Sequence, residues 1–154
     1  MRRHSSLACL IVGLWLIIGA NLTGTFLCIK SIADQMVAQR EGCIINVSSG
    51  TGLSGSRNSA AYAAAKAGVF GLTKSVAREL GDYNIKVNAV CAGHIAHDSG
   101  TSNRKATTDD ASGTDNLLHR TSGSALEFAR FVVHLSTMDN ISGQTLNLDS
   151  KIRF

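Results

Sequence analysis

The residues of this 154-residue chain that are best suited to chemistry are a tyrosine, a lysine and a serine. Tyr62 and Lys66 stand four apart in an alanine-rich segment that we expect to be helical. Both side chains then leave the same helix face, about one turn apart. Ser49 comes thirteen residues before Tyr62, at the end of an apolar run.

These three side chains together suit proton transfer to or from a carbonyl or alcohol oxygen. A free tyrosine titrates near ~10 and is a poor acid or base at neutral pH. A lysine ammonium one helical turn away favours the phenolate, which lowers the pKa of the phenol. A serine hydroxyl can hold the reacting oxygen beside it. Taken alone, the tyrosine and lysine are also consistent with a solvated surface pair. The serine alone is also consistent with an ordinary loop residue.

The elements that must position these residues are read from hydrophobic periodicity. A continuous apolar run indicates a buried parallel strand, and an apolar stripe at helical spacing indicates a packed helix. Alternating helices and buried strands predict a parallel sheet with helices on both faces. The predicted elements are a helix over 21–40, a strand over 43–47, the central helix over 59–80, a strand over 85–90, a helix over 124–137, and a turn and strand over 142–149.

The segment from about Asn21 to Gly93, and more loosely to Asp149, resembles the short-chain dehydrogenase/reductase family. It is most similar to the 3-oxoacyl-acyl-carrier-protein reductases and related alcohol and sugar dehydrogenases. The match includes Ser49, the Tyr62-x-x-x-Lys66 motif and an asparagine twenty-eight residues before the serine. The resemblance implies an α/β fold: part of a Rossmann-like, three-layer αβα parallel sheet that corresponds to the C-terminal half of the family domain.

The resemblance also implies a role for each matched residue. It makes Tyr62 the acid/base, while Lys66 lowers the pKa of Tyr62 and binds the nicotinamide ribose. Ser49 positions the substrate oxygen, and Asn21 supports a water relay. The implied activity is hydride transfer between NAD or NADP and a small alcohol or ketone substrate.

Two further positions are implied to approach the nicotinamide through their backbone. They are Gly93 and Ile95, which follow the predicted strand 85–90. The family normally has a proline before this glycine, but the chain contains no proline. We therefore expect a looser turn at this point.

The family's phosphate-binding features are missing from the sequence. It has no Gly-x-x-x-Gly-x-Gly turn, no residue that selects the adenosine ribose and no Asn-Asn-Ala-Gly segment. By resemblance, the half that binds pyrophosphate and adenine is absent. This leaves a second interpretation, in which the chain is a catalytically silent, truncated family member that acts as an oligomerisation or interaction module.

The first twenty residues form an atypical apolar leader before a partial domain over 21–154. Arg2 and Arg3 precede the apolar run from Leu7 to Ala20, which is the pattern of a signal peptide. The run is shorter than the ~20 residues of a membrane span. We interpret it as part of a buried helix with an atypical leader and expect a cytoplasmic protein. A membrane-directed segment and a displaced translation start are the alternatives.

The charge pattern and the possible metal ligands limit the kinds of partner that the protein is expected to bind. The net charge is +4, with basic residues scattered, so no nucleic-acid surface is expected. His94, His97 and Asp98 form an incomplete ligand set, so no metal site is predicted. The small residues of the central helix predict close packing against another helix. By resemblance this partner comes from a second subunit, giving a homo-oligomer through helices 21–40 and 59–80.

Overall fold

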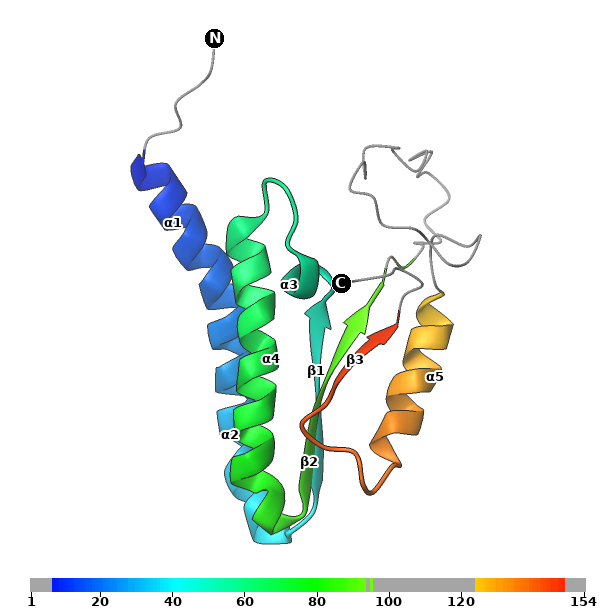
Figure 1. Ribbon diagram of the computed structural model, residues 1–154. Coiled ribbons are helices and arrows are strands. Elements are labelled where there is room, and N and C mark those ends of the chain that lie inside the picture. The colour runs from blue at the N-terminus through cyan, green and yellow to red at the C-terminus, as the bar shows by residue number, and fades with distance from the viewer. Residues whose placement is uncertain (1–6, 94, 96–123, 149–154) are drawn as a thin grey trace.

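The chain is built around three parallel strands. The computed structural model describes residues 7–93, 95 and 124–148 (Figure 1). The strands are β1 (Gly42–Ser49), β2 (Ile85–Ala92) and β3 (Thr145–Leu148), and they lie in the order β1-β2-β3. Helices α2 and α4 lie on one side of this sheet and α5 on the other (Figure 1). The predicted α/β class and parallel sheet are therefore confirmed.

The N-terminal helix is longer than predicted. It runs without a break through α1 (Leu7–Ile18), a π-helical segment η1 (Gly19–Thr23) and α2 (Gly24–Gln39). The expected start at Asn21 therefore lies inside a helix, and division of the chain after residue 20 would cut through η1. The helix ends at Arg40, whose φ of 52° is left-handed.

The same helix is the one candidate membrane span among the described residues. Residues Ile11–Gln39 are long and apolar enough to cross a membrane, judged by length and composition alone. Packed core helices and signal sequences pass the same test, so this finding is weak. Here α1, η1 and α2 all contact α4.

Helix α4 (Ala60–Leu80) covers one face of β1 and β2. Alternate strand residues point to it: Asn46 on β1 bonds to the α4 side chain of Thr73, and Ile44 packs in the same cluster as Val76. Because the β1 and β2 residues pair in register, Val87, Ala89 and Cys91 share this face. The buried α4 residues are Ala65, Val69, Phe70, Thr73, Val76 and Ala77.

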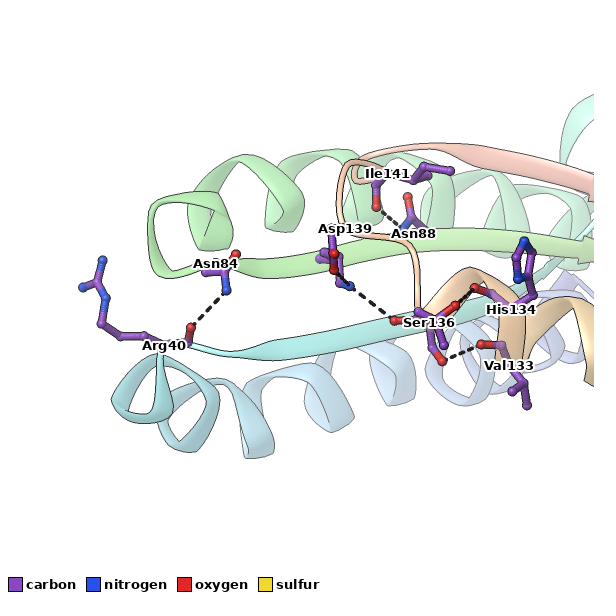
Figure 2. A network of polar contacts seen from close by, with 10 residues as sticks. Arg40, Asn84, Asn88, Val133, His134, Ser136, Asp139 and Ile141 are labelled. Atoms are coloured by element: carbon purple, nitrogen blue, oxygen red, sulfur yellow. Dashed lines mark hydrogen bonds and ion pairs between the residues drawn. The ribbon is translucent and has the colours of Figure 1, made fainter.

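On the opposite face, β2 side chains hold α5 (Ala125–Ser136) and the turn that leads into β3. Helix α5 begins with a capping box in which Ser124 and Glu127 bond to each other's backbone N–H. The Nζ of Lys86 lies 3.2 Å from the carbonyl oxygen of Ser136, at the end of α5. Buried Asn88 donates to the Ile141 carbonyl at 2.8 Å, as Figure 2 shows.

A glycine permits the closest approach to α4. Gly52 belongs to the short helix α3 (Thr51–Ser54), which lies between β1 and α4. A Cβ atom at this position would lie 2.7 Å from the backbone nitrogen of Ala67 and from the carbonyl carbon of Lys66. Backbone atoms cannot move aside as a flexible side chain can. Gly52 is therefore required for α3 to pack against α4.

We predict that Gly52→Ala lowers the free energy of unfolding by about 1–3 kcal/mol, because the added methyl group overpacks this contact. Gly81→Ala is the matched control: Gly81 has helical φ and ψ at the end of α4, and a Cβ there meets no atom within 4 Å. The control should raise the free energy of unfolding by up to about 1 kcal/mol through helix propensity. Urea unfolding measures both. A Gly52→Ala protein as stable as wild type would contradict the packing argument.

Candidate active site

The candidate catalytic residues gather near the carboxyl ends of β1 and β2. In the parallel register Ser49, the last residue of β1, pairs with Ala92, and Gly93 follows directly. Tyr62 and Lys66 lie in the first turns of α4, and Lys66 contacts the end of β1. In open α/β sheets, ligands bind just beyond the carboxyl ends of the parallel strands. The sheet therefore brings Ser49 and Gly93 to the end where Lys66 is bound.

Lys66 is held by two consecutive residues of β1. Its amine donates to the Val47 carbonyl at 3.1 Å. Its own carbonyl accepts a hydrogen bond from the hydroxyl of Ser48 at 2.8 Å. Main chain and side chain of the lysine are thus both fixed to the same strand.

The Val47 carbonyl points away from β2. Gly143 N–H bonds to the Val87 carbonyl and Ala89 N–H to the Gln144 carbonyl, so these β2 residues direct their backbone groups toward β3. The direction of the backbone N–H and C=O groups alternates along a strand, so those of Val90 point to β1. Val47 pairs with Val90 in the parallel register, so its own backbone groups point away from β2. Among the described strands none pairs with this side of β1. The Lys66 amine therefore lies at the edge of the sheet.

Tyr62 lies beside the lysine. The Lys66 amine is 5.6 Å from the centroid of the Tyr62 ring, within cation–π range. The Ser49 hydroxyl accepts a hydrogen bond from the Thr51 N–H at 3.2 Å. Within the described part of the chain, no side-chain hydrogen bond joins Tyr62 to Ser49 or to Lys66. The structure thus pairs Tyr62 with Lys66 and places Lys66 at the strand end that carries Ser49.

Asn21 sits in the π-helical segment η1. Its side-chain nitrogen donates to the Ile17 carbonyl at 3.1 Å, within its own helix. The next residue, Leu22, packs against α4, where a Cβ at Gly68 would lie 2.7 Å from the leucine Cδ2. Single π-helical turns inside α-helices are frequent at functional sites. The structure brings this turn to α4 but shows no hydrogen bond from Asn21 to Lys66 among the described residues.

The segment after β2 is described only in part. Gly93 and Ile95 are included, and both are partly buried. His94, His97 and Asp98, which the sequence raised as an incomplete ligand set, lie outside the described residues. In the described ranges, no group of three or more His, Cys, Asp or Glu side chains is arranged to hold a metal ion.

The glycines that follow β1 do not form a phosphate-binding loop. Gly50, Gly52 and Gly55 have the G-x-G-x-x-G spacing of a dinucleotide-binding turn, and they follow a strand. However, the backbone N–H groups of Thr51, 53, 54 and 55 are already bonded to oxygen atoms of residues 49–51. Gly52 serves helix packing instead. The spacing alone would have misidentified this loop.

Burial sets the electrostatics of the site. It lowers the pKa of Lys66 below the ordinary lysine value, because partial removal from water disfavours the charged amine. A smaller Coulomb effect of Cys91, on β2, acts in the opposite direction on the pKa of Lys66. A lysine with a lowered pKa is poised for proton chemistry or for binding polar ligand groups.

Sequence reasoning missed two buried polar contacts between β1 and α4. One is the Ser48–Lys66 hydrogen bond, and the other joins the Asn46 side-chain nitrogen to the Thr73 hydroxyl at 2.9 Å. Asn46, Ser48 and Thr73 are all buried. The available signal was the presence of polar residues at the helix-facing positions of an otherwise apolar strand.

Comparisons with known proteins agree with this geometry. Residues 16–108 match the family model of the short chain dehydrogenases. The chain is 39% identical over 139 residues to a 3-oxoacyl-acyl-carrier-protein reductase of Staphylococcus epidermidis. It is 50% identical over 82 residues to one from Synechocystis. These matches cover 86% and 53% of this chain, but 54% and 33% of the two relatives.

Solved structures show the same likeness. A 3-hydroxyacyl-CoA dehydrogenase type-2 from Mycobacterium avium matches with a TM-score of 0.81 and 29% identity, over 94% of this chain and 58% of its own. Acetoin dehydrogenase from Salmonella typhimurium matches with a TM-score of 0.74 and 30% identity, over 91% and 55%. The chain thus spans a third to somewhat over half of the proteins it matches.

We predict that the free energy of unfolding of wild type, minus that of Lys66→Met, increases as the pH rises from the lowered pKa of Lys66 toward the ordinary lysine value of 10.5. In this window the unfolded chain binds more protons than the folded one, so raising the pH favours folding. Urea unfolding at a series of pH values measures the difference.

Subtracting the variant also removes an opposing effect. Burial raises the pKa of the Cys43 thiol, with nearby Lys86 acting against this. The contribution of Cys43 to stability therefore falls as the pH rises above the ordinary thiol value of 9.0. Cys43 is present in both proteins, so its effect cancels. A difference that stays flat or decreases would show that Lys66 is not desolvated.

Proposed function

The chain belongs to the short-chain dehydrogenase family, and we propose that it is an oxidoreductase for hydride transfer between NAD or NADP and a small alcohol or ketone. The observation that carries the proposal is the placement of Tyr62 and Lys66 on one face of α4, at the carboxyl ends of parallel strands. The names of the matched relatives refer to oxoacyl, hydroxyacyl and acetoin substrates, all of which contain a carbonyl or a carbinol carbon.

Each residue has a role in this proposal. Tyr62 gives a proton to the substrate oxygen in reduction and takes it in oxidation. Lys66 keeps a positive charge near the tyrosine ring and binds the nicotinamide ribose. Ser49 donates a hydrogen bond to the same substrate oxygen, while Asn21 supports a water relay that returns the proton to solvent.

The residues present suit the nicotinamide end of the cofactor. Lys66 has the donors to hold the ribose hydroxyls, and the backbone of Gly93 and Ile95 would approach the ring. When bound, the cofactor supplies or accepts the hydride. The N–H groups of residue 51 and residues 53–55 are used internally, so this loop does not suit the pyrophosphate. The nicotinamide end is the same in both nucleotides, so the proposal covers both NAD and NADP.

A non-catalytic, self-associating module is the rival function. It is favoured by the unsuitability of the loop after β1 for pyrophosphate and by the edge of β1 that no described strand covers. An unpaired strand edge is a template for association with another chain. Cofactor binding separates the two functions, because only the oxidoreductase requires it.

We predict that Tyr62→Phe lowers kcat by about 100- to 10,000-fold, the usual size of a general acid–base contribution. The change removes the proton donor and keeps the ring, so cofactor binding should persist. Turnover of acetoin and of a 3-oxoacyl thioester, with NADH and NADPH, measures kcat. Nicotinamide fluorescence measures binding.

The control is Tyr83→Phe, which alters a tyrosine in the turn after the C-terminal end of α4. It should leave kcat unchanged. Equal activity of Tyr62→Phe and wild type would refute the assigned role. Failure of the wild-type chain to bind either nucleotide would favour the non-catalytic module.

We also propose a cytoplasmic homo-oligomer that associates through helices 21–40 and 59–80. Phe26, Leu27 and Ile32 are exposed on the first helix. On the second, small exposed residues follow one face at helical spacing: Ala60, Ala64, Ala67 and Gly71. A flat row of this kind permits close helix packing. In this proposal residues 21–154 form the partial domain and the apolar N-terminal residues precede it.

We predict that Leu27→Glu shifts the sedimentation coefficient toward that of the monomer, because it places a charge in the proposed interface. The matched control Leu126→Glu makes the same change at an exposed leucine of α5, outside the two proposed interface helices, and should not shift it. Wild type should not co-sediment with lipid vesicles. Vesicle binding that Leu27→Glu abolishes would instead assign this helix to a membrane surface.

A further inference from the structure

Ser48 is a buried serine whose hydroxyl reaches across from β1 to α4. It is 5% exposed, and its Oγ donates to the Lys66 carbonyl at 2.8 Å. The carbonyl of the preceding residue, Val47, accepts a hydrogen bond from the Lys66 amine at 3.1 Å. Adjacent residues of one strand therefore hold the main chain and the side-chain end of the same lysine.

The Lys66 turn is confined on a second side as well. Gly52 of α3 approaches the carbonyl carbon of Lys66 so closely that a Cβ would lie 2.7 Å from it. The turn thus lies between α3 and the Ser48 hydroxyl. By contrast, the other polar contact between β1 and α4, Asn46 to Thr73, lies seven residues further along the helix.

We propose that Ser48 is a positioning residue: by bonding to the Lys66 carbonyl it fixes the helix turn from which the lysine amine reaches the outer edge of β1. The role of Lys66 in this inference rests on the proposed function, but the experiment that tests the inference does not. Lysine has a flexible four-carbon stem, so the location of its main chain limits where its amine can go.

The chemistry of the contact favours positioning over helix formation. Within α4 the Lys66 carbonyl already accepts the helical hydrogen bond from four residues ahead. A carbonyl oxygen has two lone pairs, so Ser48 occupies the second. Removal of the hydroxyl leaves no buried backbone group unpaired. Ser48→Ala is therefore expected to loosen the lysine turn while α4 remains helical.

The readout is the ionisation of the Lys66 amine, because its pKa is lowered by burial at this location. The titratable neighbours that the structure shows are Cys91 on β2 and Tyr62 on α4. Both are unchanged in all the variants compared. A shift in the Lys66 midpoint therefore reports a change in the surroundings of the amine.

The experiment is trace acetylation of the full chain over a range of pH, with the rate at Lys66 measured by mass spectrometry. The pH midpoint of that rate is independent of how accessible the amine is. We expect Ser48→Ala to raise the midpoint toward the ordinary lysine value, by about half a pH unit or more, as the amine gains water. Ser48→Thr keeps the hydroxyl and should restore the wild-type midpoint.

The matched control is Thr73→Val, which removes the other buried tether between the same strand and helix and should leave the midpoint unchanged. If this variant does not fold, Val69→Ala replaces it, since Val69 is a fully buried α4 residue without a polar tether. An unchanged midpoint in Ser48→Ala, or equal shifts in Ser48→Ala and the control, would overturn the proposal. The labelling needs no cofactor, so a chain that binds no nucleotide would refute the oxidoreductase while this test still gives its result.

Discussion

The close contact between α4 and β1 is the interaction on which the rest of the structure depends. The residues beside this contact are small: Ala65, next to Lys66 on α4, is fully buried, and Gly52 lets α3 pack beside the Lys66 turn. At this separation a serine on the strand reaches a helix carbonyl directly. A bulkier residue on either side would move the lysine away from the strand end. The same residues therefore determine both how the helices pack and where the lysine lies.

The two-residue alternation of the strands divides the functions of the sheet. Side chains of Asn46 and Ser48 point to α4 and bind it, while Lys86 and Asn88 point to the other face and hold the end of α5 and the turn into β3. Backbone groups alternate in the same way, so Val47 offers its carbonyl to the outer edge. A shift of one residue in register would exchange the faces and dissolve both sets of contacts.

Features set by local sequence were predictable, and features set by distant contacts were not. The parallel strands and α4 follow from apolar runs and helical spacing, and the Tyr62–Lys66 pairing needs only the pitch of a helix. The helix start was misplaced because residues 7–20 are apolar throughout and give no periodicity to distinguish a leader from a packed helix. The role of Ser48 could not be read, since a polar residue in a strand acquires its meaning from the helix that crosses it.

The hydrogen bond between Lys66 and Val47 holds the amine in place and uses only one of its N–H donors. An ammonium group carries three N–H donors, and the Val47 carbonyl accepts one of them. Two donors therefore remain for ligand hydroxyls, and the positive charge stays near the ring of Tyr62. Because the accepting carbonyl belongs to the strand backbone, it cannot rotate away as a side chain can. The strand edge thus supplies a fixed anchor for an otherwise flexible lysine, and the proposed proton transfer by Tyr62 requires this rigidity.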